Sequence, residues 1–98
     1  MSQRASAVLV LGCAWVLWSH SISTKPDFDV WQLEQVMPTN AGCEREKQLT
    51  QQAYARQARQ SGDVKTAKDT VYLTRGEQTI VFGWYCYPDT IDPRQPKR

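Results

Sequence analysis

The sequence predicts an α+β domain in which one main helix, over about residues 41–60, packs on a small antiparallel sheet and is tied to it by one disulfide. Three observations predict this class. One segment with a helical period lies between segments that alternate with the period of a strand. The chain has 98 residues, enough for one small domain at most. A hydrophobic content of 41%, with four Trp, argues against disorder.

Two strands are expected before the helix. Residues 15–18 are rich in aromatic and β-branched side chains and predict a first strand. Residues 19–27 are polar and contain a Lys-Pro pair, so they predict a loop. Residues 28–37 alternate in part and predict a half-buried strand that Pro38 ends. Its apolar face is expected to carry Trp31, Leu33 and Met37.

The predicted helix runs from Ala41 to about Gln60. Thr39 and Asn40 supply an N-cap, and the segment is composed mainly of strong helix formers. Gly62 follows the expected end, where a residue that tolerates a positive φ belongs. At 100° per residue the apolar stripe is thin, so the helix is expected to lie on a surface. The stripe consists of Cys43, Leu49, Ala53 and Tyr54.

A β-hairpin is expected after the helix. Residues 63–69 are charged and unpatterned, which predicts a mobile linker. Residues 70–74 and 79–87 are strand-like, and the turn between them contains Gly76. Alternation divides the second strand into two rows. One row is Ile80, Phe82, Trp84 and Cys86, and the other is Val81, Tyr85 and Tyr87.

The cysteines indicate how the domain is closed. Helical spacing puts Cys43 on the apolar stripe, and alternation puts Cys86 in the row with Phe82 and Trp84. Both thiols therefore face one interior, and we expect a Cys43–Cys86 disulfide worth roughly 4 kcal/mol in the chain-entropy model. Buried free thiols in a cytosolic protein are the alternative. There is no Cys-x-x-Cys pattern, so neither a metal site nor a cofactor is expected.

The amino terminus indicates export. A short segment with one positive charge precedes an apolar run that is too short for a confident membrane span. Within it, Val10-Leu11-Gly12-Cys13 resembles the lipobox of bacterial lipoproteins. The resemblance implies cleavage after Gly12 and lipid on Cys13, and it would explain an odd count of three cysteines. Two alternatives stay open: ordinary secretion with cleavage after Ser21 or Ser23, and retention of the segment as an anchor or a buried strand.

Aromatic side chains are the main candidates for a binding site. A stacking surface for peptide or glycan could contain Tyr72, Trp84, Tyr85 and Tyr87 together with Tyr54. The competing interpretation is that these side chains fill a small core. The helix also has an arginine face (Arg45, Arg56 and Arg59), which is expected to be solvated.

No residue is assigned to catalysis. Asp89 and Asp92 stand beside prolines, where acidic residues commonly form turns. The single histidine, His20, has no nucleophile or partner that the sequence identifies, and it is expected to be solvated in a loop. Twelve Lys and Arg against ten Asp and Glu give a net charge of +2. Such a small and scattered excess argues against a nucleic-acid partner.

The two ends of the chain resemble those of a known group of proteins. Gly-Cys-Ala-Trp-Val-Leu-Trp near the start and Cys-Tyr-Pro-Asp-Thr-Ile-Asp-Pro-Arg near the end are similar to small, uncharacterised bacterial envelope proteins. The most specific part is the Cys-x-Pro-Asp-x-x-Asp-Pro-Arg ending, from Cys86 to Arg94. The resemblance implies export and a disulfide-closed domain, and it implies no activity.

These observations predict a signal segment over 1–12, one domain over 13–87 and an extended or disordered Pro-rich tail over 88–98. The expected function is that of a non-catalytic module of the cell envelope. It would be anchored in the membrane by lipid on Cys13, face the periplasm or the exterior, and bind an envelope protein or a wall component. The alternatives are a secreted inhibitor-like or structural domain and a membrane protein with an uncleaved anchor.

Overall fold

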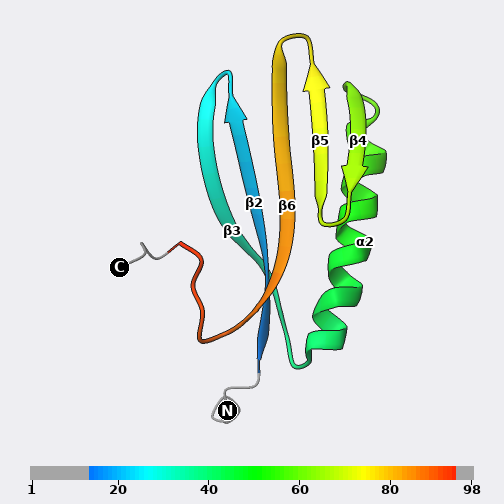
Figure 1. Ribbon diagram of the computed structural model, residues 1–98. Helices are drawn as coiled ribbons and strands as arrows, with labels where there is room; N and C mark the ends of the chain where they lie inside the picture. The colour runs from blue at the N-terminus through cyan, green and yellow to red at the C-terminus, as the bar shows by residue number, and fades with distance from the viewer. Residues whose placement is uncertain (1–13, 95–98) are drawn as a thin grey trace.

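The computed structural model describes residues 14–94 (Figure 1). The elements in this part of the chain are β2 (Trp15–Thr24), β3 (Asp27–Met37), α2 (Asn40–Ala58), β4 (Asp63–Ala67), β5 (Thr70–Arg75) and β6 (Gln78–Pro88). The predicted α+β class is confirmed, because within these residues one helix packs on a five-stranded antiparallel sheet. The predictions that concern residues 1–13, including lipid on Cys13, fall outside the described residues.

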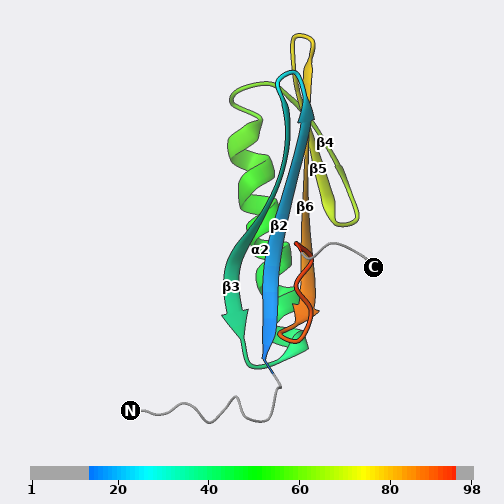
Figure 2. The same ribbon diagram turned by 90° about the vertical axis from the view of Figure 1, so that its left-hand side faces the viewer.

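The sheet has the strand order β3-β2-β6-β5-β4. The β2–β3 hairpin lies beside the β4-β5-β6 meander, and the two units join where β2 pairs with β6. Seen edge-on in Figure 2, α2 lies on one side of the sheet, and the segment after β6 lies on the other. We call the side that faces away from α2 the open face.

Two segments expected to be irregular are strands. Residues 19–24 continue β2, and Asp63–Ala67 forms β4, so the predicted loop over 19–27 and the predicted linker over 63–69 are both wrong. Residues 19–23 pair with β3 on one side and with β6 on the other. This pairing satisfies the hydrogen-bonding groups of their backbone, so the segment forms a strand although most of its side chains are polar. β4 is an edge strand, and exposed charge on an edge protects it from pairing with other chains.

A β-bulge changes the predicted faces of β3. Leu17 pairs with Gln35 and the next residue, Trp18, pairs with Leu33, so Glu34 is an extra residue in β3. The extra residue reverses the alternation. Met37 therefore joins Leu17 in the core under α2, while Leu33 lies on the open face, and the prediction that they share a face is wrong.

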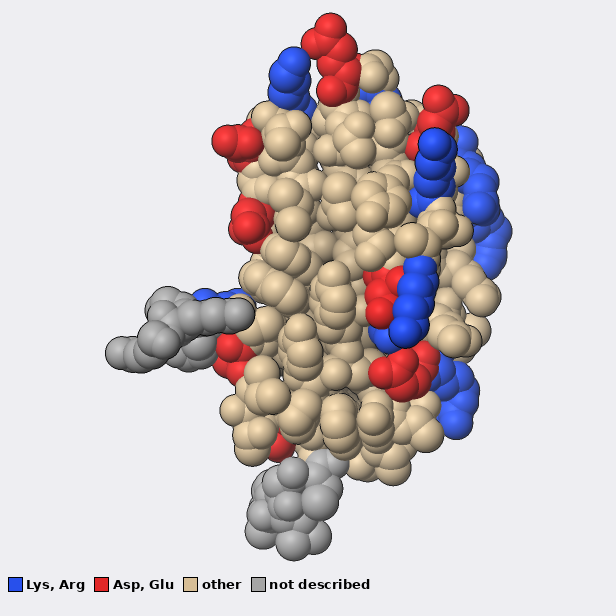
Figure 3. All heavy atoms as spheres, in the orientation of Figure 1, with Lys and Arg blue, Asp and Glu red and all other residues tan. Residues whose placement is uncertain are grey.

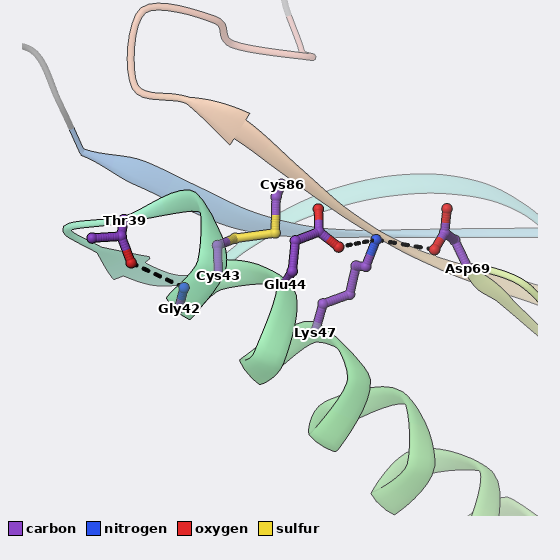
Figure 4. Close-up of a disulfide and its surroundings, with 7 residues drawn as sticks. All are labelled: Thr39, Gly42, Cys43, Glu44, Lys47, Asp69 and Cys86. Atoms are coloured by element: carbon purple, nitrogen blue, oxygen red, sulfur yellow. Dashed lines mark hydrogen bonds and ion pairs between the residues drawn. A yellow bond between two sulfur atoms is a disulfide. The ribbon is translucent and has the colours of Figure 1, made fainter.

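Helix α2 begins and ends close to its predicted bounds. The Thr39 hydroxyl accepts a hydrogen bond from the Gly42 amide at 3.0 Å, which confirms the N-cap (Figure 4). The predicted stripe is only partly buried, because Leu49 is 54% exposed and Ala53 is also exposed. The residues of the helix that are buried are Cys43, Ala55 and Ala58.

Gly62 has a different role from the one predicted. It does not have a positive φ, which among the described glycines belongs to Gly76 in the β5–β6 turn. A Cβ at Gly62 would lie 2.5 Å from the carbonyl oxygen of Thr74. The glycine is therefore needed because the chain leaving α2 passes close to the backbone of β5.

The predicted disulfide is confirmed. The sulfurs of Cys43 and Cys86 are 2.13 Å apart and their Cα atoms 6.1 Å apart, so the bond ties the first turn of α2 to the last part of β6 (Figure 4). Cys43 is completely buried. It belongs to a core cluster with Leu17, Met37, Ala55, Val71 and Trp84.

The segment after β6 packs on the sheet as far as Arg94. The Asp89 amide donates to the Ala14 carbonyl at 3.0 Å, and the Arg94 guanidinium carbon lies 5.0 Å from the centroid of a Trp18 ring. Asp92 accepts from Arg94 at 2.8 Å. The expectation of an extended or disordered tail is therefore wrong for residues 88–94, and the folded part of the chain extends past residue 87. Gln95–Arg98 lie outside the described residues.

Candidate functional site

Among the described residues, no helix or second sheet covers the open face, although the segment after β6 covers part of it, where Arg94 packs on Trp18, which is 3% exposed. Strand alternation and the observed pairing decide which side chains it carries. From β2 and β3 these are Val16, Trp18, His20, Ile22, Trp31 and Leu33. From β5 and β6 they are Tyr72, Val81, Tyr85 and Tyr87. Such a concentration of aromatic and aliphatic groups would normally be covered by a second layer.

Four rings form a continuous row across this face. His20 stacks on Trp31, with ring centroids 4.0 Å apart and planes 4° apart. The Trp31 and Tyr85 centroids are 5.8 Å apart, and those of Tyr85 and Tyr87 are 6.2 Å apart with planes inclined by 8°. We call His20, Trp31, Tyr85 and Tyr87 the aromatic row. It joins three strands, so its geometry is set by the sheet and not by a loop.

Hydrogen bonding and a glycine hold the row in place. His20 Nε2 lies 2.5 Å from an Asp29 carboxylate oxygen, which orients the imidazole against Trp31. Gly83 lies on the open face two residues before Tyr85. A Cβ at Gly83 would lie 2.5 Å from the Tyr85 hydroxyl and 2.8 Å from Cζ of its ring. The absence of a side chain at Gly83 therefore allows the Tyr85 ring to lie along the strand.

Tyr85 contributes a neutral hydroxyl to the aromatic row. Burial raises the pKa of Tyr85 above its ordinary value of 10.0, and the neighbouring Tyr87 and Asp69 raise it further. The phenol is therefore protonated and can both donate and accept a hydrogen bond. Figure 3 looks onto the open face, where uncharged residues fill the middle and most Lys, Arg, Asp and Glu side chains lie toward the margins.

Exposed apolar side chains extend the aromatic row toward the edges of the sheet. Leu33 is 49% exposed and Val36 is 55% exposed, both on β3, and Ile22 and Tyr72 are exposed as well. Scattered exposed apolar residues are normal, but a contiguous group next to stacked rings is typical of an interaction surface. The open face therefore has the composition of a contact surface, with an apolar centre and a charged rim.

The structure divides the predicted binding residues between the two sides of the sheet. Tyr72, Tyr85 and Tyr87 lie on the open face, with Tyr72 on β5 and the other two on β6. Trp84 lies on the side under α2, is 3% exposed and belongs to the core, so it cannot contribute to that surface. Tyr54 also lies on the helix side, where its ring centroid is 4.4 Å from that of Phe82.

Two members of the row, Trp31 and His20, differ from what the sequence predicts. Trp31 is expected only as a buried residue of a strand, and His20 is expected in a loop, solvated and without a partner. Both have defined partners, because β2 is longer than predicted and pairs His20 with Trp31. The alternation of Trp18, His20 and Ile22 in the sequence is the signal that could have revealed this face.

Within residues 14–94 no group of three or more His, Cys, Asp or Glu side chains is placed to hold a metal ion. No helix in the same range is long and apolar enough to cross a membrane. No protein-family model, curated protein or solved structure matches the chain. Function is therefore inferred from the surfaces that the described residues present.

Proposed function

We propose that the protein is an exported, non-catalytic binding module of the bacterial cell envelope, anchored by lipid on Cys13, which holds an envelope protein against its open face. The observation that carries this proposal is the aromatic row with the exposed Leu33 and Val36 beside it. Rigid aromatic side chains contribute large contact area at a small cost in conformational entropy.

The cysteines support export. A disulfide in a small domain is compatible with an oxidising compartment, where such bonds persist. Because Cys43 and Cys86 pair with each other, Cys13 is the one cysteine left over in the sequence. It is also the cysteine that stands in the lipobox-like Val10-Leu11-Gly12-Cys13 segment.

The position of β2 supports cleavage before Cys13 over cleavage farther along. A cut after Ser21 or Ser23 would remove most of β2, including Leu17, which is completely buried, and Trp18, which is 3% exposed. It would also leave β6 without its β2 partner. A chain beginning at Cys13 keeps β2 intact, and only Ala14 separates the lipid-bearing residue from the sheet. Such a short tether would hold the domain close to the membrane surface.

Site-specific photo-crosslinking in cells tests the binding surface. A photoreactive phenylalanine analogue placed at Tyr72 or Tyr87 is expected to capture a discrete envelope protein. The same analogue at Arg56, an exposed residue on α2, serves as the control and is expected to capture none. Equal capture from both sides of the domain, or capture from Arg56 alone, would contradict the proposal.

A further inference from the structure

The side of β2 that faces α2 carries serine where a core strand would carry large apolar residues. Ser19 pairs with Trp84 and Ser21 with Phe82, both across the β2–β6 interface, and Ser23 continues the same row opposite Ile80. Small polar side chains at inward positions forgo packing and leave space beside their larger neighbours. A row of such side chains is therefore expected where the space that they leave can hold a ligand.

The space is a groove of about 190 Å³ between β2, β3, β6 and the helix. Its floor is formed by Ser19 and Ser21 of β2. The remaining lining comes from Gln32 and Glu34 of β3, Thr50 and Tyr54 of α2, and Phe82 and Trp84 of β6. We call this the serine groove. It lies on the opposite side of the sheet from the aromatic row.

One wall of the serine groove is aromatic. The ring centroid of Tyr54 is 4.4 Å from that of Phe82 and 5.6 Å from that of Trp84. The rings of Phe82 and Trp84 are inclined by only 21° to each other along β6. The Tyr54 ring is inclined by 48° to Phe82 and by 56° to Trp84, so this wall is apolar but angled. Because Trp84 is only 3% exposed, Tyr54 and Phe82 provide its accessible surface.

The other wall is polar and is shaped by the β-bulge. The extra residue, Glu34, lines the groove, and its carboxylate accepts a hydrogen bond from the Ser19 hydroxyl at 2.7 Å. Gln32 adds an amide, and Thr50 and Ser21 add hydroxyls. Among residues 14–94, no Lys or Arg lines the groove. β-bulges commonly re-aim a side chain in this way beside a functional site.

We propose that the serine groove binds one ring of an uncharged sugar. Hydroxyl and amide groups both donate to and accept from the adjacent hydroxyls of a sugar, and the carboxylate accepts from them, while the C–H face of the ring lies on the aromatic wall. The single carboxylate and the absence of lining cations disfavour anions. The volume, well below that of sites for drug-sized ligands, suits one ring.

The inference goes beyond the proposed function, because the groove and the open face lie on opposite sides of the sheet. Loss of one site therefore leaves the other intact. The loss of stability caused by the serine row can also be measured. Replacing Ser21 by Leu would fill the groove with apolar volume beside Phe82 and is expected to keep or raise the melting temperature while it removes the ligand site.

NMR titration of the mature chain tests the inference, with glucose, galactose and N-acetylglucosamine as probes. At least one of these sugars is expected to shift the Ser21 amide and the Trp84 indole resonances, with a dissociation constant in the millimolar range. Ser21→Leu is expected to weaken that binding at least tenfold and Glu34→Gln several-fold. Tyr72→Ala, on the open face, is the matched control and is expected to leave it unchanged.

Three results would overturn the inference. The first is the absence of saturable shifts at the groove with all three sugars. The second is unchanged affinity in a folded Ser21→Leu variant, which would place the sugar elsewhere. The third is binding of acetate or phosphate at the same resonances as strongly as the sugars, which would contradict the preference for an uncharged ligand. None of these results bears on capture of a protein by the open face.

Discussion

His20 on β2 lies flat against Trp31 on β3, with their planes only 4° apart, and Asp29 hydrogen-bonds the outer edge of the imidazole. The three residues belong to one hairpin, in which His20 is paired with Trp31 and Asp29 with Ile22. Because the strand pairing places His20 beside Trp31, it also fixes how the two rings are arranged on the open face.

Replacing His20 by Ala is expected to lower the free energy of unfolding by about 1 kcal/mol, because it removes a cross-strand aromatic pair. Chemical denaturation monitored by far-ultraviolet circular dichroism would measure the change. His20→Phe is the matched variant, since it keeps a ring against Trp31 and loses only the bond to Asp29. Equal destabilisation by Ala and Phe would show that stacking contributes nothing.

Gly83 is expected to be required for the position of Tyr85. In Gly83→Ala the new methyl group would overlap the ring, so Tyr85 must leave its place beside Trp31. Nuclear Overhauser contacts between Tyr85 and Trp31 should disappear, and crosslinking from the open face should weaken. In a Tyr85→Ala background the same Gly83→Ala change should have no cost. A cost that persists in that background would indicate another cause.

Reduction of the Cys43–Cys86 bond is expected to destabilise the domain by roughly 2–5 kcal/mol. The bond ties α2 to β6 across a small core, and few apolar residues of the helix are buried to replace it. Thermal unfolding of Cys43→Ser/Cys86→Ser, compared with the oxidised protein, measures the loss. An unchanged melting temperature would mean that packing alone holds the helix on the sheet.

Stability is expected to fall above about pH 10 because of Lys47 and two partly buried tyrosines. Burial would lower the pKa of Lys47, but its ammonium donates hydrogen bonds to Glu44 at 2.8 Å and to Asp69 at 3.0 Å, and these bonds and the two negative charges raise the pKa above 10.5 (Figure 4). Burial raises the pKa of Tyr54 and of Tyr85 above 10.0. The unfolded chain then loses these protons first, so the contribution of each group is present below its ordinary pKa and is lost as the pH rises through the folded value.

Urea denaturation at about pH 9 and about pH 11 tests this dependence. The oxidised protein should be less stable at the higher pH, and Lys47→Met should lose less stability between the two. Tyr72→Phe, at an exposed residue, is the control and should behave like the unaltered protein. A dependence that Lys47→Met leaves unchanged would exclude the ion pairs as its cause.

Local periodicity was sufficient to predict the helix, the β5–β6 hairpin and the Cys43–Cys86 bond. The helix and the hairpin follow patterns local to one segment, such as the alternation that separates Trp84 from Tyr85. The bond could be predicted because two such local patterns, one in α2 and one in β6, each assign a cysteine to the inward side. The remaining features depend on pairing between distant segments. Polar residues 19–24 form a strand because β6 lies beside them, and Met37 changes face because of one extra residue at Glu34. Neither condition is visible in local composition.

The candidate site was predictable only in part for the same reason. Tyr85 and Tyr87 could be assigned to one face from their own strand, but Trp31 and His20 join them only through the sheet. The prolines and charged side chains of residues 88–94 predict an extended tail, but this segment packs on the sheet. Arg94 packs on Trp18, a contact between residues far apart in the sequence.

We propose that the chain works at the membrane as a lipid-anchored, disulfide-closed module that begins at Cys13. Intact mass spectrometry of the protein purified from bacterial membranes without reductant tests it most directly, because one spectrum reports the cleavage site, the lipid and the thiol state. We expect a chain whose first residue is Cys13, which carries acyl groups there and lacks the two hydrogens lost when Cys43 and Cys86 pair. A mass that retains residues 1–12, or that begins at Cys13 without lipid, would contradict it.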